Sequence, residues 1–266
     1  MKILKILINN LFSKFNLKLL SLDNFDKLLS EKKQLSIEKD RLQATNQLIQ
    51  VIKPLLLNQF IKNTYYSKSQ LAQDLFVMSE LNFKKNGFFV EFGSTDGIDL
   101  SNSFLLEKKF FWKGILAEPA KEWHKDLIQN RDVFIEKNCV WHSSNKILTF
   151  NEVGVLSTID SFSNLDIHAE TRVEGKKYKV KTISLEDLLD KYNAPKIIDY
   201  LSIDTEGSEY DILSSFNFEK YKFRVITCEH NFTSNREKIF NLLSDKGYER
   251  KYSKISKFDD WYVLKV

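Results

Sequence analysis

The stretch Phe88-Phe89-Val90-Glu91-Phe92-Gly93-Ser94-Thr95-Asp96-Gly97 decides how this chain folds. Its apolar run is typical of a parallel strand that is buried on both faces, because such a strand shows no alternation. Gly93 and Gly97 then allow a sharp turn and leave room for a ligand beside the backbone. A helix is expected over residues 98–107. This unit is the usual start of a nucleotide-binding α/β fold, although its ExGxxxG spacing alone also fits a tight turn in any α/β domain.

Two later strands also end on acidic residues. Residues 114–118 end on Glu118, about twenty residues beyond the glycine turn, where dinucleotide-binding folds place the acid that accepts hydrogen bonds from ribose hydroxyls. Residues 197–203 run into Asp204. Because open α/β sheets bind ligands at the carboxyl ends of their strands, Glu91, Glu118 and Asp204 are predicted to line one crevice.

Three motifs in this order resemble the FkbM family of S-adenosylmethionine-dependent O-methyltransferases: VEFGSTDGIDLSNSFLLEKKFFWKGILAEPAKE, LSIDTEGSEYDIL and ITCEHN. The resemblance covers residues 67–266. It implies an α/β, Rossmann-like class I methyltransferase fold, with a mostly parallel seven-stranded sheet and an antiparallel C-terminal strand. It also implies S-adenosylmethionine as cofactor, with residues near Asn138 along the adenine edge. The expected cofactor-binding residues are Glu91, Gly93, Ser94, Gly97, Glu118, Asn138, Cys139 and Asp204.

The later segments continue the α/β alternation. A helix is expected from Pro119 to Asn130, and a single strand over residues 132–140. Residues 151–177 show weak periodicity, so they are either a plain surface loop or the segment that recognises the acceptor. Two strands close the chain and must be antiparallel to each other, since a short loop joins them. Such a terminal hairpin is a mark of methyltransferases that nicotinamide-binding Rossmann domains typically lack.

Methyl transfer to a hydroxyl requires a general base, a metal ion or both, because an alcohol is a poor nucleophile at neutral pH. His230 and Asp204 are the predicted catalytic residues, with His230 as the base. Asp204 and Glu229 resemble the carboxylates that hold Mg²⁺ in catechol-type O-methyltransferases, so they are the candidate metal ligands. The plainer alternative is that Asp204 caps the following helix and His230 only hydrogen-bonds a loop.

Charge is unevenly distributed along the chain. The net charge is +4, and residues 1–60 contain ten Lys or Arg against five Asp or Glu, so the remainder carries 4 − 5 = −1. A nearly neutral main domain argues against a nucleic-acid partner. The only two cysteines, Cys139 and Cys228, end apolar runs and are expected to be buried free thiols, as in a reducing cytoplasm.

The N-terminal part, residues 1–63, is predicted to be a helical extension of a methyltransferase domain at residues 64–266. Residues 1–20 contain four lysines and no acid, and lack an uninterrupted apolar core. They are expected either to contact the inner face of the membrane or to pack on protein. Leu28, Leu35, Leu42 and Ile49 recur every seven residues, which favours a homo-oligomer through this helix over a single packed helix.

The expected function is therefore cytoplasmic O-methylation of a sugar hydroxyl, on a nucleotide-linked sugar or on a building block of capsular polysaccharide or lipopolysaccharide. The acceptor rests on the resemblance alone. Two alternatives stay open: a nicotinamide-dependent Rossmann oxidoreductase, and a non-catalytic helical scaffold with a ligand-binding domain.

Overall fold

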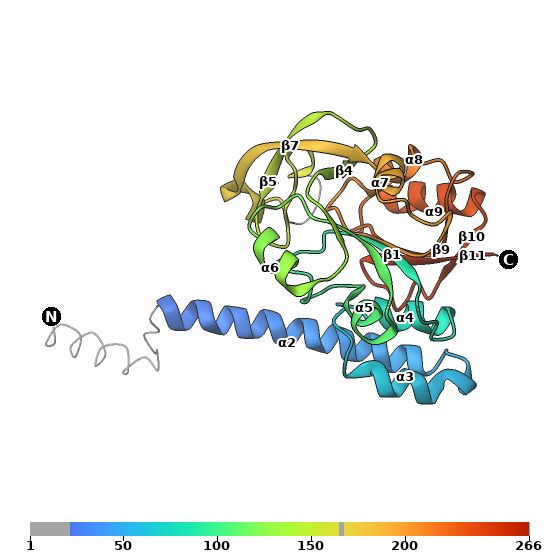
Figure 1. Cartoon of the computed structure of the whole chain (residues 1–266). Coiled ribbons are helices and arrows are strands. Elements are labelled where there is room, and N and C mark those ends of the chain that lie inside the picture. The colour runs from blue at the N-terminus through green and yellow to red at the C-terminus, as the bar shows by residue number, and fades with distance from the viewer. Residues whose placement is uncertain (1–21, 165–167, 266) are drawn as a thin grey trace, which may run out of the picture. The chain divides into compact units, whose positions relative to one another are not determined.

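The computed structural model describes residues 22–164 and 168–265 (Figure 1). These residues fall into two compact units, and the boundary lies between Asp40 and Arg41. Helix α2 (Leu22–Ile49) contributes to both units. The predicted membrane contact of residues 1–20 lies outside the described residues. Among the described helices, none combines the length and the apolar character that crossing a bilayer requires.

The described part of the N-terminal extension, from Leu22 onward, is mainly helical. After α2, Pro54 begins the short 3₁₀ helix η1 (Pro54–Leu56), which leads directly into α3 (Leu57–Thr64). Ala44 and Leu48 of α2 are fully buried and belong to the core of the larger unit. The end of α2 therefore has a core to pack against, which the sequence pattern did not reveal.

A seven-stranded sheet lies at the centre of the larger unit. Its strand order is β10-β11-β9-β8-β1-β2-β3, and β1 lies between β8 and β2. β11 pairs antiparallel with β9 and β10, while the other pairs are parallel. This arrangement confirms the predicted Rossmann-like class I methyltransferase fold. The strands are β1 (Phe88–Phe92), β2 (Lys113–Ala117), β3 (Phe134–Glu136), β8 (Ile197–Ile203), β9 (Lys222–Glu229), β10 (Tyr248–Lys251) and β11 (Asp259–Leu264).

Helices cover both faces of this sheet (Figure 1). One apolar cluster joins the sheet to α7 (Leu185–Lys191), α8 (Glu209–Ser214) and α9 (Asn235–Asp245). A second cluster joins the other face to α3, the end of α2, and three further helices. These are α4 (Gln73–Glu80), α5 (Phe104–Phe110) and α6 (His124–Asn130). Both faces are therefore buried, which explains why β1 and β8 show no regular alternation of apolar and polar residues.

A second, four-stranded sheet is inserted between the two halves of the fold. Its order is β4 (Cys139–Trp141), β7 (Lys176–Ser184), β5 (Ile147–Glu152) and β6 (Thr158–Ile159), and it has its own small apolar cluster. Between β5 and β7, the described part of the chain contains β6 and two short 3₁₀ helices, η2 (Asp160–Phe162) and η3 (Thr171–Glu174).

Three predicted elements were wrong at their boundaries. The helix expected at residues 98–107 begins only at Phe104, because Glu91 binds the preceding residues as a loop. The helix expected from Pro119 begins at His124. The single strand expected over residues 132–140 is two strands, and β3 and β4 belong to different sheets.

Candidate active site

The glycine turn after β1 touches the end of β8. Gly93 has φ +73°, and a Cβ at this position would lie 2.2 Å from the backbone oxygen of Asp204. Gly97, with φ +81°, faces the side chains of Leu127 and Arg131 at the end of α6. Both glycines are therefore required by close approach within the protein, and Gly93 brings the first strand end directly onto Asp204.

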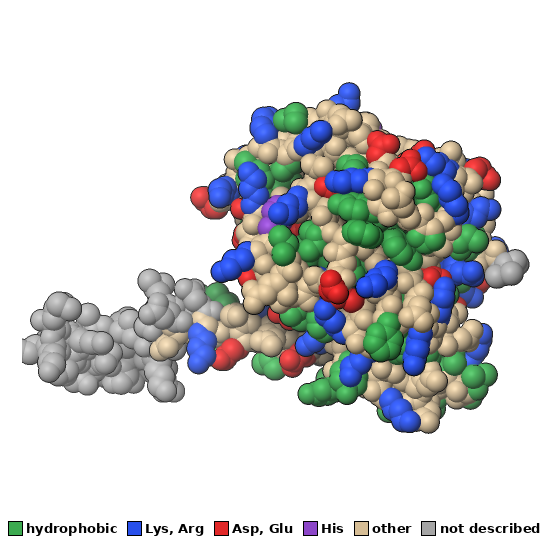
Figure 2. All heavy atoms as spheres, in the orientation of Figure 1, with side chains coloured by type: hydrophobic (Ala, Val, Ile, Leu, Met, Phe, Trp, Pro, Cys, Tyr) green, Lys and Arg blue, Asp and Glu red, His purple; other side chains and the backbone are tan. Residues whose placement is uncertain are grey.

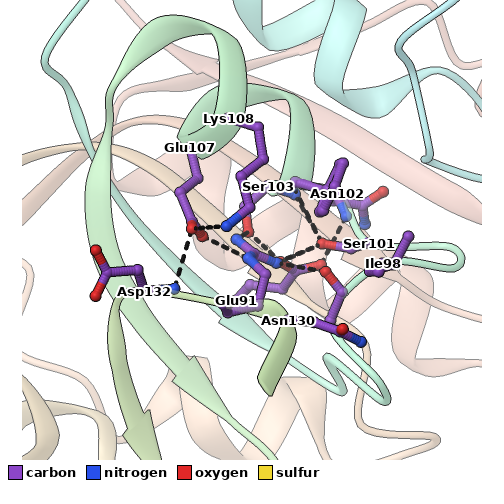
Figure 3. Close-up of polar contacts among 12 residues, drawn as sticks. Glu91, Ile98, Ser101, Asn102, Ser103, Glu107, Lys108, Asn130 and Asp132 are labelled. Atoms are coloured by element: carbon purple, nitrogen blue, oxygen red, sulfur yellow. Dashed lines mark hydrogen bonds and ion pairs between the residues drawn. The ribbon is translucent and has the colours of Figure 1, made fainter. Parts of the chain in front are cut away.

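Glu91 fastens the loop that follows this turn (Figure 3). Its buried carboxylate accepts hydrogen bonds from the N–H of Asn102 at 2.6 Å, from the hydroxyl of Ser101 at 3.1 Å and from the hydroxyl of Ser103. Arg131 donates to Ser101 and Ser103 at 3.0 and 2.8 Å, respectively. Glu91 thus positions the loop, and its direct contact with the cofactor stays a prediction.

Glu118 at the end of β2 joins two backbone segments across the strand ends. Its carboxylate accepts hydrogen bonds from the N–H of Thr95 and from the N–H of Ala120, both at 2.8 Å. Burial raises the pKa of Glu118 to about 7, and the nearby charge of Asp204 contributes in the same direction. The first and second strand ends therefore meet Asp204, at the end of a third strand, in one place.

The residues expected at the adenine edge lie beside Glu118. Cys139 is a buried free thiol, and burial together with the charge of Glu118 raises its pKa to about 12. Asn138 is half-buried between β3 and β4, where its N–H donates to Glu136 at 2.9 Å. Cys228 is also buried and free, which confirms that prediction for both cysteines.

Ser94 gives a direct indication that the turn binds a polar ligand. This residue is 1% exposed, and its hydroxyl has no hydrogen-bond partner among the described residues. A buried hydroxyl without a partner is unfavourable, so a ligand that supplies one stabilises the turn. The Ser94 hydroxyl, the backbone at Gly93 and the Glu118 carboxylate together fit a ligand that carries both ribose hydroxyls and an amino-acid group.

Three carboxylates converge at the ends of β8 and β9. Asp204, Glu206 and Glu229 each offer an oxygen, and these oxygens all lie within 4.8 Å of one another. Glu229 is 7% exposed, and its Oε2 accepts no hydrogen bond from the part of the chain that the structure describes. Glu206 has φ +58°, a conformation that non-glycine residues rarely adopt outside functional sites and tight turns.

The segment between β5 and β7 covers this acidic cluster. Arg172 is fully buried, and its guanidinium donates to Oε2 of Glu206 at 2.7 Å. The hydroxyl of Thr158 donates to the backbone oxygen of Glu206 at 2.9 Å. Asn231, after β9, donates to the same carboxylate at 3.1 Å. The irregular segment therefore places one cation and one hydroxyl donor on Glu206, two residues after the predicted catalytic residue Asp204.

Burial and mutual repulsion raise the pKa of two of these acids, Asp204 and Glu229. Burial raises the pKa of Asp204 to about 6, and burial next to Asp204 and Glu206 raises the pKa of Glu229 well above its usual range. Asp259, opposite Glu229 on β11, has a pKa raised to about 8, mainly by burial. Gln73 of α4 donates to Asp259 at 2.7 Å. Glu206, Arg172 and Asp259 were not among the predicted site residues.

The side chain of His230 lies in a different environment. Its Nδ1 accepts a hydrogen bond from the N–H of Phe232 at 3.0 Å, and its Nε2 is 3.9 Å from Asp260. Burial lowers the pKa of His230, and the charged groups that act on the ring are Asp260, Arg236 and Arg250. With its acceptor nitrogen occupied, His230 is less suited to remove a proton than Asp204 or Glu229. Its role as base stays a prediction.

Replacing Glu118 tests the cofactor site. We expect Glu118→Ala to weaken binding of S-adenosylhomocysteine by roughly 1.5–3 kcal/mol for each charge-assisted hydrogen bond that is lost. Isothermal titration calorimetry measures the change, and thermal unfolding of the variant checks that it is folded. Glu219→Ala, on an exposed loop before β9, is the matched control. Equal affinities of the two variants would remove Glu118 from the binding site.

The sheet order, the antiparallel terminal strands and the acids at the strand ends define a class I methyltransferase. Residues 91–252 match the family described as the methyltransferase FkbM domain. That match covers more than half of the chain, and the chain belongs to this family. It is therefore an S-adenosylmethionine-dependent methyltransferase.

Solved methyltransferases are similar to this chain at low sequence identity. A precorrin-6y C5,15-methyltransferase from Geobacter metallireducens is 10% identical, with a TM-score of 0.40 over 71% of this chain and 84% of that chain. A putative RNA methyltransferase from Pyrococcus horikoshii is 11% identical, with a TM-score of 0.37 over 74% and 82%. A ribosomal protein L11 methylase from Lactobacillus delbrueckii is 12% identical, with a TM-score of 0.36 over 74% and 76%. None of the curated proteins that were compared matches this chain.

Proposed function

We propose that this methyltransferase acts on a hydroxyl oxygen, and that Asp204 with Glu229 removes the proton. The observation that supports the proposal is the convergence of Asp204 with Glu206 and Glu229 directly beside the glycine turn, where burial raises the pKa of Asp204 to about 6. A carboxylate with such a pKa is ionised at pH 7 and is still a stronger base than an ordinary aspartate. A neutral nitrogen acceptor can attack the methyl group before it loses a proton, so it has less need of such a base than a hydroxyl.

The chemistry divides between cofactor and protein. When bound, S-adenosylmethionine supplies an electrophilic methyl group on a sulfonium ion. The protein orients the acceptor hydroxyl in line with that group and accepts the hydroxyl proton as the new C–O bond forms. Ser94, Glu118 and the backbone at Gly93 hold the cofactor in this proposal, and Asp204 receives the proton. The buried Glu229 next to it can share that proton, because the two acids strongly affect each other's pKa.

A sugar is the proposed acceptor, carried on a nucleotide or destined for a surface polysaccharide. Family membership suggests this class, and the polar cover over the cluster, with Arg172 and Asn231, supports it. A panel of nucleotide-sugars incubated with enzyme and S-adenosylmethionine is the test, with mass spectrometry detecting the gain of one methyl group. If the protein binds the cofactor but methylates none of these nucleotide-sugars, the result would favour another acceptor or the non-catalytic scaffold. Family membership speaks against the nicotinamide alternative.

As an alternative to a metal-free base at Asp204, we propose that Asp204, Glu206 and Glu229 hold Mg²⁺, since a carboxylate bound to the ion is a much weaker base. Oxygen ligands from carboxylates are those that Mg²⁺ prefers, and Oε2 of Glu229 has no partner within the described residues. Arg172 already offsets part of the negative charge at Glu206, so the remaining demand for a cation lies at Asp204 and Glu229. Bound there, Mg²⁺ would act as a Lewis acid on the acceptor oxygen.

Removal of divalent cations tests the metal. We expect a chelator to abolish turnover and added Mg²⁺ to restore it, because the ion lowers the pKa of the acceptor hydroxyl. Calorimetric titration of Mg²⁺ into the chelator-treated enzyme should show binding, which Glu229→Gln should weaken. Full turnover in the chelator, together with no heat of binding, would contradict the metal.

Self-association through the N-terminal helix is a further proposal. Leu28 and Leu35 of α2 are 49% and 65% exposed, so the heptad stripe is available to a second copy. We expect Leu28→Glu with Leu35→Glu to reduce the oligomer to a monomer in light scattering. Ser30→Glu with Gln34→Glu, which lie off the stripe, are the controls. If the wild-type protein and both double variants have the same mass, an oligomer through this stripe is excluded.

We place the enzyme in the cytoplasm, since its two cysteines are free and buried and form no disulfide.

A further inference from the structure

One face of the larger unit carries exposed apolar and basic side chains together. It consists of residues 51–68, which include α3, and of Lys108 and Lys109 on α5; we call it the docking face. Figure 1 shows α3 beside α4 and α5, at the lower end of the unit. None of these residues belongs to the acidic cluster or to the glycine turn, so the face is separate from the active site.

The apolar residues of the docking face are unusually open. Leu55 is 80% exposed, Ile61 is 52% exposed and Tyr65 is 88% exposed. Of the α3 side chains only Phe60 is buried, so the helix uses one narrow side for the core and presents Ile61 to solvent. Large side chains gathered in this way mark an interaction surface more often than they occur by chance.

The charge of the docking face has one sign. Residues 41–73 contain no aspartate or glutamate, but do contain Lys62 and Lys68. Lys108 and Lys109 add two further cations, and the neighbouring acid Glu107 pairs both with Lys108, at 2.6 Å, and with Arg131. Figure 2 shows basic and hydrophobic side chains intermixed over the region of α3. Any partner of this face therefore has to be negatively charged and to accept apolar side chains.

A shallow hollow of 280 Å³ lies within the docking face. Tyr65, Tyr66, Lys68, Lys108 and Lys109 are among the residues that line it. The ammonium group of Lys109 lies 3.5 Å from the centre of the Tyr66 ring, which holds it at the rim of the hollow. Three lysines around a small aromatic-lined hollow fit a phosphate group.

We propose that this face docks the enzyme on an anionic bilayer surface. Lysines attract the phosphates of acidic lipids, tyrosines occupy the headgroup level, and Leu55 and Ile61 enter the acyl boundary. A second copy of the chain is disfavoured as the partner, because it would bring like charges together. Nucleic acid is also disfavoured, because it would bind the lysines and leave the exposed aliphatic side chains without an apolar partner. Ser69 directly follows the docking face and forms a β-bridge with Leu100, which lies in the loop after the glycine turn. Docking would therefore hold the active site close to the membrane.

Vesicle sedimentation of the full chain tests the docking face. The wild-type protein should bind phosphatidylcholine vesicles that contain phosphatidylglycerol, and bind much less to phosphatidylcholine alone. The charge reversal Lys62→Glu, Lys68→Glu, Lys108→Glu and Lys109→Glu should weaken binding at least about tenfold, as should high salt. Four reversals elsewhere, at the exposed Lys181, Lys222, Lys246 and Lys265, form the matched control.

A second variant keeps the test interpretable if the fourfold charge reversal prevents folding. Leu55→Ser with Ile61→Ser removes exposed side chains only, and should reduce vesicle binding while melting temperature and cofactor affinity stay unchanged. Residues 1–20 are present in every protein, so undiminished vesicle binding by both variants overturns the proposal. It is also overturned if the variants keep vesicle binding and lose binding to a single-stranded oligonucleotide or lose self-association.

Discussion

Asp204→Asn is expected to lower turnover by about 10²–10⁴-fold while S-adenosylhomocysteine still binds. The amide keeps the shape of the side chain but cannot accept the hydroxyl proton. Steady-state rates and calorimetry on the same preparation separate the two effects. Asp245→Asn on the exposed end of α9 is the control for the loss of one negative charge.

The pH profile gives this prediction a second readout. Because the pKa of Asp204 is raised to about 6, its active carboxylate form is lost as pH falls through that value. The wild-type rate should therefore drop about tenfold for each pH unit below 6 and level off above it. His230→Asn should keep this profile, because Nδ1 of that ring is occupied by the N–H of Phe232. A large loss in His230→Asn with an active Asp204→Asn would instead make His230 the base.

Gly93→Ala is the substitution with the largest expected effect on the fold. The added Cβ would lie 2.2 Å from the backbone oxygen of Asp204, and φ is +73°. Overpacking of this kind costs roughly 1–3 kcal/mol and the left-handed backbone adds roughly 1–2 kcal/mol. We expect the free energy of unfolding to fall by about 2–5 kcal/mol, which is about 4–20 °C in melting temperature for a unit of this size. Cofactor affinity should fall as well.

Gly154→Ala separates backbone strain from close approach. Gly154 also has a left-handed φ of +55°, but a Cβ there meets no atom within 4 Å. Its replacement should cost only the roughly 1–2 kcal/mol of the backbone conformation. Equal losses of stability in the two variants would show that the contact between Gly93 and Asp204 is unimportant.

The strand ends were predictable from sequence because two local rules combine there. An apolar run that stops at a glycine or an acid marks a strand end, and parallel topology brings such ends to one edge. Gly93, Glu118 and Asp204 follow both rules, and the structure brings them together.

The rest of the site depends on contacts that no local pattern encodes. Asp259 reaches the cluster through the antiparallel register of β11 with Glu229, and Gln73 binds it from 186 residues away. Arg172 arrives from an irregular segment. The orientation of His230 depends on a turn in which Asn231 and Phe232 have positive φ, and such a turn has no clear sequence signature.

The network around Glu91 has a consequence for the thermodynamics of binding. Arg131 donates to the backbone oxygen of Gly97 at 2.9 Å and also binds Glu107, so the loop after the glycine turn is tied to α5 and to the end of α6. A loop that is ordered before the ligand arrives loses little conformational entropy when the ligand binds. Cofactor association should thus be fast and close to rigid docking, with most of the ordering cost left to the acceptor and the segment that covers it.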